Sequence, residues 1–245
     1  MINLSTPSQQ MLDELNADLE RILYWQNRWH SGADWIAAAQ GYRDRWNKER
    51  KPFIASEHEY KSANGNRWYC FDIPFWPEGF DDLMMLSASF IYYETYASIG
   101  AFIPKYMMNE QTNMMEDACV IYTSHFFERY CERMKIPFRS RQMVLEFASI
   151  IAFNPLKDDT DKDGRLIVVS RMPKAGFTYG VRRNDNPNII EMRTFLSDKN
   201  MTPTKLRRYE ELRERVDDDS FIAESYNLSV WGSIYQKNNI AIPKE

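Results

Sequence analysis

Apolar residues first recur at helical spacing near the start of the chain. Four aliphatic residues lie three or four positions apart: Leu12, Leu15, Leu19 and Ile22. This spacing keeps them on one face of an α-helix, and Thr6 followed by Pro7 supplies a capping side chain and a proline that the first turn tolerates. A second helical pattern covers residues 34–49 and ends before Pro52. We therefore expect an N-terminal helical hairpin.

From residue 53 the pattern becomes typical of β-strands. Four segments rich in aromatic and β-branched residues are expected strands: 54–62, 67–73, 84–93 and 96–103. Asn64-Gly65 lies between the first two, and Asn-Gly is a strong hairpin signal. A helix is the alternative for the last two segments. Pro104 and the polar residues that follow it, through Asp117, predict a connection without regular structure.

The second half of the chain has a different order of elements. A short strand at 118–122 leads into a helix over 123–134, and a second helix covers 140–153. Three strands are expected next: 165–170, 177–183 and 189–196.

Two further helical patterns close the chain. Thr202-Pro203 predicts a capped helix that reaches about Val216, and residues 220–236 favour one more. The whole order predicts an α+β fold. Residues 1–117 would form an N-terminal helical and β region, and residues 118–245 an α-α-β-β-β module with C-terminal helices.

The net charge of −4 hides an uneven distribution. Residues 1–119 contain 10 Lys and Arg against 17 Asp and Glu, a net of −7, whereas residues 120–215 contain 19 against 13, a net of +6. Residues 216–245 contain 2 against 5, a net of −3. A basic middle points to an anionic partner. The alternative is that the parts neutralise one another across an internal interface.

The first helix of the second half carries the candidate chemistry. At about 100° per residue, His125, Arg129 and Arg133 stand on one face of it, with Glu128 and Glu132 beside them. Two arginines four positions apart can grip one phosphate. A histidine one turn away can accept the proton of a 2′-hydroxyl, and the arginines can stabilise the transition state, so these groups suffice for metal-independent RNA cleavage. The alternative is a solvated helix face with Arg–Glu pairs.

The run from Tyr122 to Met134, with its His-x-x-x-Arg-x-x-x-Arg spacing, resembles a helix of small toxin-like domains related to the RelE/barnase-like ribonucleases. The order of helix, helix and three antiparallel strands is similar to that family's layout. The resemblance covers about residues 118–200. It implies a ribosome-dependent or free RNA endonuclease, or a relative that has lost activity.

The resemblance also implies roles for single residues. His125 would be the general base, and Arg129 and Arg133 would bind phosphate and stabilise the transition state. By strand position, four later residues could join the site and bind substrate: Arg182, Arg183, Arg193 and Thr194. Neither a cofactor nor a metal is implied. The alternative is a non-catalytic protein-interaction or scaffold protein that reuses the fold, in which the aromatic residues and the uneven charge serve a protein partner.

Other features of the sequence indicate where in the cell the protein is expected. Cys70, Cys119 and Cys131 are odd in number and lack metal-ligand spacing, which predicts buried, reduced thiols. The first ten residues lack the pattern of a signal peptide, and no apolar stretch reaches the roughly 20 residues of a membrane-spanning helix. We therefore expect a cytoplasmic protein with RNA or a protein as its partner and no membrane association; the oligomeric state stays open.

The run from Asp159 to Gly164 matches the D-x-D-x-D-G opening of a calcium loop. The twelfth position of such a loop needs a bidentate acid, and here it is Ser170. The residues after Gly164 also have the pattern of a strand. The favoured interpretation is a solvated turn before a strand, with a calcium loop as the alternative.

Overall fold

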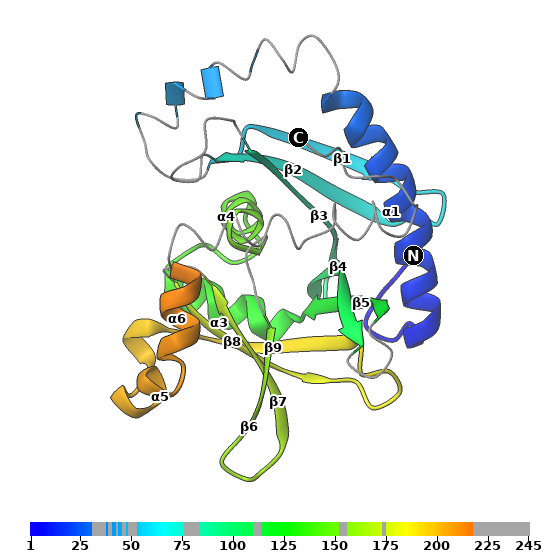
Figure 1. Ribbon diagram of the computed structural model, residues 1–245. Helices are drawn as coiled ribbons and strands as arrows, with labels where there is room; N and C mark the ends of the chain where they lie inside the picture. The colour runs from blue at the N-terminus through cyan, green and yellow to red at the C-terminus, as the bar shows by residue number, and fades with distance from the viewer. Residues whose placement is uncertain are drawn as a thin grey trace.

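One sheet of nine strands organises the molecule (Figure 1). The computed structural model describes residues 1–30, 38, 41–42, 44–45, 48, 53–75, 84–109, 114–151, 156–172 and 175–217. The strands are β1 (Ser56–Lys61), β2 (Arg67–Phe75), β3 (Met84–Glu94), β4 (Ile99–Asn109), β5 (Met114–Tyr122), β6 (Leu156–Thr160), β7 (Leu166–Met172), β8 (Gly176–Arg182) and β9 (Ile189–Ser197). Their order across the sheet is β1-β2-β3-β4-β5-β9-β8-β7-β6. Neighbouring strands are antiparallel, except that β5 and β9 run parallel.

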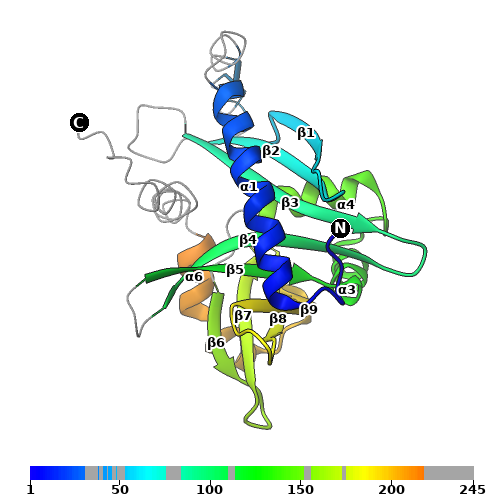
Figure 2. The same cartoon turned by 90° about the vertical axis from the view of Figure 1, so that its right-hand side faces the viewer.

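Helices lie on both faces of this sheet. They are α1 (Ser8–His30), α3 (Ser124–Met134), α4 (Arg141–Ile151), α5 (Pro203–Arg208) and α6 (Glu210–Asp217), with a 3₁₀ turn at Asp198–Asn200. Figure 2 shows α1 crossing over the strands of one face, and Figure 1 shows the sheet curving around α4 on the other. No helix among the described residues combines the length and the apolar character needed to span a membrane.

The larger core lies between the sheet and the pair α3 and α4. Aromatic rings fill it in edge-on and stacked pairs; Tyr122 and Phe126 meet edge-on, with ring centres 4.6 Å apart. Phe147 of α4 meets Phe90 of β3 at 5.5 Å and Phe127 of α3 at 4.9 Å. Such pairs add to the stability that burial of the rings supplies. The face under α1 has a second apolar cluster, to which Leu15 and Ile22 of the expected helical stripe contribute.

The α+β class expected from the sequence is confirmed, and so are most elements. The N-terminal helix is present as α1, and β1 and β2 form the Asn-Gly hairpin, with Gly65 at φ +81° in the left-handed region that glycine favours. Most of residues 34–49, and with them the second helix of the expected hairpin, lie outside the described residues. The expected helix over residues 220–236 lies wholly outside them.

The expectation of a connection after Pro104 is wrong. Strand β4 continues through Pro104, which pairs with Cys119 of β5, and β5 begins at Met114. The β3–β4 pairing covers only residues 99–102 of β4, so Pro104 lies beyond it. A proline is tolerated there because its missing N–H removes no ladder hydrogen bond on that side.

The acidic segment near Asp159 also differs in detail from the expectation. Residues 156–160 form an additional strand, β6, which pairs with β7. The turn between them is solvated as expected: the Asp161 carboxylate accepts hydrogen bonds from the main-chain N–H of Asp163 (2.8 Å) and Arg165 (2.9 Å). Asp159 itself pairs with Arg208 and accepts a hydrogen bond from the Tyr209 hydroxyl (2.8 Å). Within the described ranges, no cluster of three or more His, Cys, Asp or Glu residues is arranged to hold a metal ion.

Strand β5 joins the two parts of the sheet. The expected boundary between residues 117 and 118 falls inside this strand, which pairs with β4 on one side and with β9 on the other. The expected helix from Pro203 to Val216 is also interrupted, because Tyr209 separates α5 from α6. Thr202 caps α5 as predicted, since its side chain accepts a hydrogen bond from the N–H of Lys205.

Candidate functional site on helix α3

Helix α3 has well-defined ends. The Thr123 side chain accepts a hydrogen bond from the N–H of Phe126 at the first turn, and Lys135 ends the helix in the left-handed conformation at φ 59°. Ser124 fastens the helix to the sheet: its hydroxyl donates to the Ile99 carbonyl (2.7 Å) and accepts from the Ile99 N–H (2.8 Å). The polar residues of α3 are therefore held on a fixed support.

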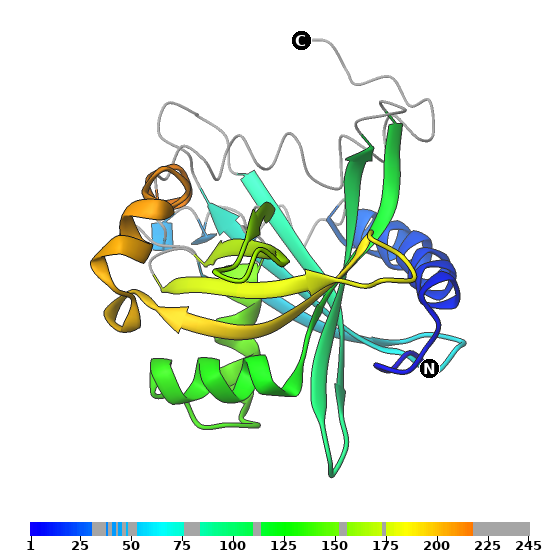
Figure 3. The same ribbon diagram turned by 90° about the horizontal axis from the view of Figure 1, so that it is seen from below.

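The two faces of α3 differ sharply in burial. Four residues of the inner face are buried: Phe126, Phe127, Tyr130 and Cys131. The opposite face is outward, as Figure 3 makes clear for the helix as a whole, and carries His125, Arg129 and Arg133. The structure thus brings the three helix residues of the predicted site onto one outward stripe.

Two of these three residues pair with acids of the same helix. The His125 Nδ1 atom lies 3.5 Å from Glu128, and each of these side chains is 56% exposed. Arg129 Nη1 lies 2.7 Å from Glu132, and the two side chains are 42% and 63% exposed. Exposed pairs of this spacing contribute only a few tenths of a kcal/mol. An anion with higher charge density can therefore displace the glutamates.

Arg133 differs from its two neighbours on the stripe. The residue is half-buried, and its Nη1 atom is buried without a hydrogen-bond partner among the described residues. A buried guanidinium N–H that makes no hydrogen bond is unfavourable. A phosphate oxygen that reached this atom would relieve that cost.

The predicted strand arginines have partners elsewhere. Arg182 forms a bidentate ion pair with Asp158 of β6, with Nε 3.0 Å from Oδ1 and Nη2 2.9 Å from Oδ2. It also donates a hydrogen bond to the Pro187 carbonyl (2.7 Å). It thereby connects the end of β8 to β6, the edge strand beyond β7, and to the turn that precedes β9. The described contacts of Arg182 do not include the outward stripe of α3.

Arg183 forms hydrogen bonds with the N-terminal segment instead. Its guanidinium donates to the main-chain carbonyls of Leu4 (2.8 Å) and Thr6 (3.2 Å), and its Nε donates to Glu191 (2.8 Å). Arg193 also pairs with Glu191, at 2.9 Å. Burial alone would raise the pKa of Glu191, but the hydrogen bonds from Arg193 and Arg183 outweigh it and hold the pKa below its usual value.

Thr194, the remaining predicted residue, lies in the sheet interior of this half. It is half-buried on β9 and pairs in register with Tyr179 of β8, next to an irregularity at Tyr179 and Gly180. The structure therefore assembles the helix part of the predicted site. The described contacts of Arg182, Arg183 and Arg193 and the strand pairing of Thr194 involve other parts of the molecule.

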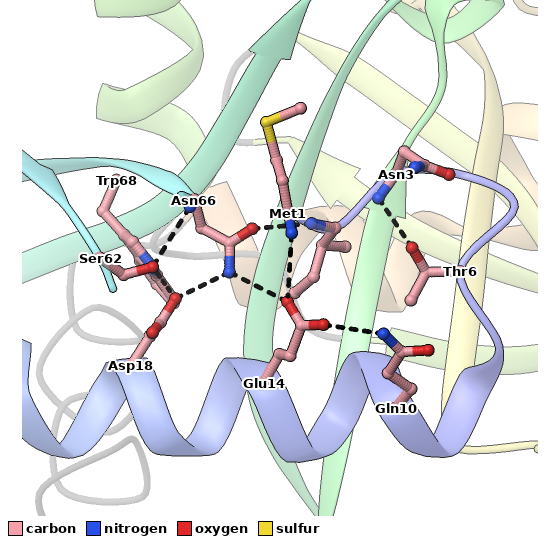
Figure 4. Close-up of polar contacts among 10 residues, drawn as sticks. Met1, Asn3, Thr6, Gln10, Glu14, Asp18, Ser62, Asn66 and Trp68 are labelled. Carbon is pink, nitrogen blue, oxygen red and sulfur yellow. Dashed lines mark hydrogen bonds and ion pairs between the residues drawn. The ribbon is translucent and has the colours of Figure 1, made fainter. Parts of the chain in front are cut away.

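Sequence reasoning missed a buried polar group that holds the N-terminal segment (Figure 4). Asp18 is 2% exposed and accepts hydrogen bonds from Asn66 Nδ2 (2.8 Å) and Trp68 Nε1 (3.0 Å). Asn66 in turn accepts from the main-chain N–H of Ile2 (2.7 Å). The signal was an acid within the apolar stripe of the first helix, between Leu15 and Leu19.

Comparison of this chain with protein-family models, with curated proteins and with solved structures found no match. The functional interpretation therefore depends on the chemistry of the residues themselves.

Proposed function

We propose that this protein binds RNA through the outward stripe of α3, in the manner implied by its resemblance to RelE/barnase-like toxin modules. The observation that carries the proposal is the alignment of His125, Arg129 and Arg133 on the outward face of α3, whose inner face packs into the aromatic core. The described acidic partners of His125 and Arg129 belong to the same helix and are weakly held. A phosphate backbone fits this face for two reasons. Its high charge density lets it displace the weakly held glutamates, and its phosphates repeat at regular intervals along the row of aligned side chains.

Cleavage is the further step of the same proposal. His125 would accept the proton of a ribose 2′-hydroxyl, whose oxygen would attack the phosphorus and displace the 5′-oxygen. The 5′-oxygen would take its proton from water, while Arg129 and Arg133 would bind the phosphate and stabilise the charge that develops on it. The described residues around the stripe do not identify a general acid for the leaving group. Binding is therefore the part of the function that the geometry supports best.

The experiment is a titration of fluorescein-labelled single-stranded RNA with the purified protein at about 50 mM salt, where phosphate contacts are strongest. Arg129→Ala should weaken binding several-fold. Arg213→Ala is the matched control, because Arg213 makes the same i,i+3 pair with Glu210 on α6. Gel analysis of the same samples tests cleavage, which His125→Ala should abolish. Wild-type protein that neither binds nor cuts RNA would refute the proposal.

A second candidate function is non-catalytic binding of a protein partner. The engagement of Arg182, Arg183 and Arg193 in ion pairs favours it, because these arginines then stabilise the fold and take no part in catalysis. This function predicts that His125→Ala behaves as the wild type and that light scattering finds a stable oligomer or complex. A monomer that captures no partner would count against it.

A further inference from the structure

Strand β3 extends beyond its neighbour β2 at one end of the sheet. The β2–β3 pairing ends where Trp68 meets Ile91, whereas β3 continues to Glu94 and pairs there with Ile99 of β4. Within the described sheet, the last residues of β3 therefore have a strand neighbour on the β4 side only. We call the resulting notch, bounded by Arg67 of β2 and residues 92–94 of β3, the β3 step.

The direction of the main-chain groups in the β3 step follows from the hairpin that β3 and β4 form. The Thr95 N–H donates to the Ser98 carbonyl (2.8 Å), so this pair faces across the hairpin. Because such groups alternate along an antiparallel strand, those of Tyr93 face β4 and those of Glu94 face the step. None of the described main-chain hydrogen bonds joins Glu94 to the N-terminal segment. Glu94 thus offers one N–H and one C=O to an added strand.

A cavity of about 570 Å³ opens at the β3 step. Its walls come from residues 1–5, from Arg67 and Tyr69 at the start of β2, and from the end of β3. The lining is mainly apolar and aromatic, and its size is that of sites that hold small ligands or a few residues of a peptide. The Tyr93 ring lies against Gly100 of β4, where any Cβ would collide with it, so the position of this wall depends on that glycine.

The N-terminal wall of the cavity is fixed to the core. Figure 4 shows the buried contacts of Asp18 and Asn66 that hold the main chain of Ile2, whose side chain is fully buried. Arg183 holds the carbonyl of Leu4 from the other side (2.8 Å). A wall that is already ordered costs little entropy when a ligand binds.

Strand direction identifies which end of a peptide the β3 step would receive. A segment that pairs antiparallel with β3, in line with β2, runs in the same direction as β2. Its C-terminal end therefore arrives next to Arg67, where β2 begins. The Arg67 side chain is 62% exposed, and its partner Glu59 is 47% exposed, so this ion pair can give way to a carboxylate.

We propose that the β3 step binds the C-terminal end of an extended peptide with apolar side chains. The peptide main chain would pair with Glu94, its apolar side chains would enter the cavity between the N-terminal wall and the tyrosines, and its terminal carboxylate would meet Arg67. This mode joins strand addition at a sheet edge with capture of a terminal carboxylate. It is independent of RNA binding, because it uses neither α3 nor its arginines.

The test uses the full chain and a panel of fluorescein-labelled tetrapeptides whose last two residues are apolar, each with a free carboxylate and as the amide. We expect several acids to bind and their amides to bind about tenfold more weakly, as the loss of one charge-assisted hydrogen bond predicts. Arg67→Gln should abolish the difference between acid and amide. Arg141→Gln is the matched control, because Arg141 is also exposed and pairs with a glutamate of β1, Glu57. It should behave as the wild type.

A second variant tests the cavity itself. Ser5 is an exposed lining residue, so Ser5→Trp should fill the cavity without unfolding the protein, and it should weaken every acid of the panel. A thermal melt like that of the wild type checks the fold. The proposal is overturned if no acid of the panel binds with a Kd below about 1 mM, or if acids and amides bind with equal affinity. It is also overturned if Arg67→Gln leaves the affinities of both acids and amides unchanged.

Discussion

Arg129 donates a hydrogen bond of 2.7 Å to Glu132, three residues further along the outward stripe of α3. Both side chains reach solvent, so the pair competes with any phosphate that approaches Arg129 while adding little to stability. Glu132→Gln should therefore tighten RNA binding about threefold, with no change in the melting temperature beyond a degree or two. Fluorescence anisotropy with labelled RNA measures the effect. Glu210→Gln, which removes the acid of the equivalent pair on α6, should leave the affinity unchanged.

The stability of the N-terminal anchor should depend on Asp18. Asp18→Ala leaves the buried N–H groups of Asn66 and Trp68 without their acceptor, which should cost about 2–4 kcal/mol of unfolding free energy. Urea denaturation provides the measurement. Asp13→Ala, on the exposed side of the same helix, should cost less than about 0.5 kcal/mol. Equal losses in the two variants would refute the role of the buried hydrogen bonds.

Lys105 should destabilise the protein in a pH-dependent way. It lies on β4 between the apolar residues Ile103 and Met107 of the same strand face, without a described ion pair, and burial lowers its pKa. The unfolded chain then binds more protons than the folded one between the lowered pKa and the usual value, so stability rises with pH across that window.

Lys105→Met should accordingly raise the unfolding free energy at pH 7 by about 1–2 kcal/mol. The gain should shrink towards pH 10, where the wild-type lysine loses its charge. Urea denaturation at both values tests this, with Lys61→Met on the exposed edge strand β1 as control. A gain that is the same at both pH values would contradict the account of Lys105.

The three thiols should be unreactive in the folded protein. All are buried and form no disulfide, and burial raises the pKa of Cys70 and Cys131 to about 11 and that of Cys119 to about 12. Because the thiolate is the reactive form, a disulfide reagent at pH 8 should modify almost no thiol in an hour and all three after unfolding. Rapid modification of one thiol in the native state would show that its surroundings open readily.

The part of the site on α3 could be predicted because its determinants are local. The cap at Thr123 and the alternation of Phe126 and Phe127 with His125 and Arg129 lie within one short segment. The partners of the strand arginines could not be predicted in this way. Arg182 meets an acid 24 positions away and Arg183 a carbonyl 179 positions away, and such contacts are set by the order of strands in the sheet.

The same limit applies to the elements of the sheet. Hairpins such as β1–β2 have a local signal in Asn64-Gly65, whereas the parallel pairing of β5 with β9 has none. Pro104 predicts a strand end, because the local effect of a proline is to break pairing. Its actual place, beyond the β3–β4 pairing, depends on where a neighbouring strand stops.

RNA binding as proposed depends on contacts between its phosphates and the outward stripe of α3. The most direct test of these contacts is the salt dependence of RNA binding by the wild type and Arg129→Ala. Each lost phosphate contact should reduce the slope of log K against log salt by about 1. We predict this reduction for Arg129→Ala and for Arg133→Ala, and none for Arg213→Ala. Equal slopes for all four proteins would contradict the account.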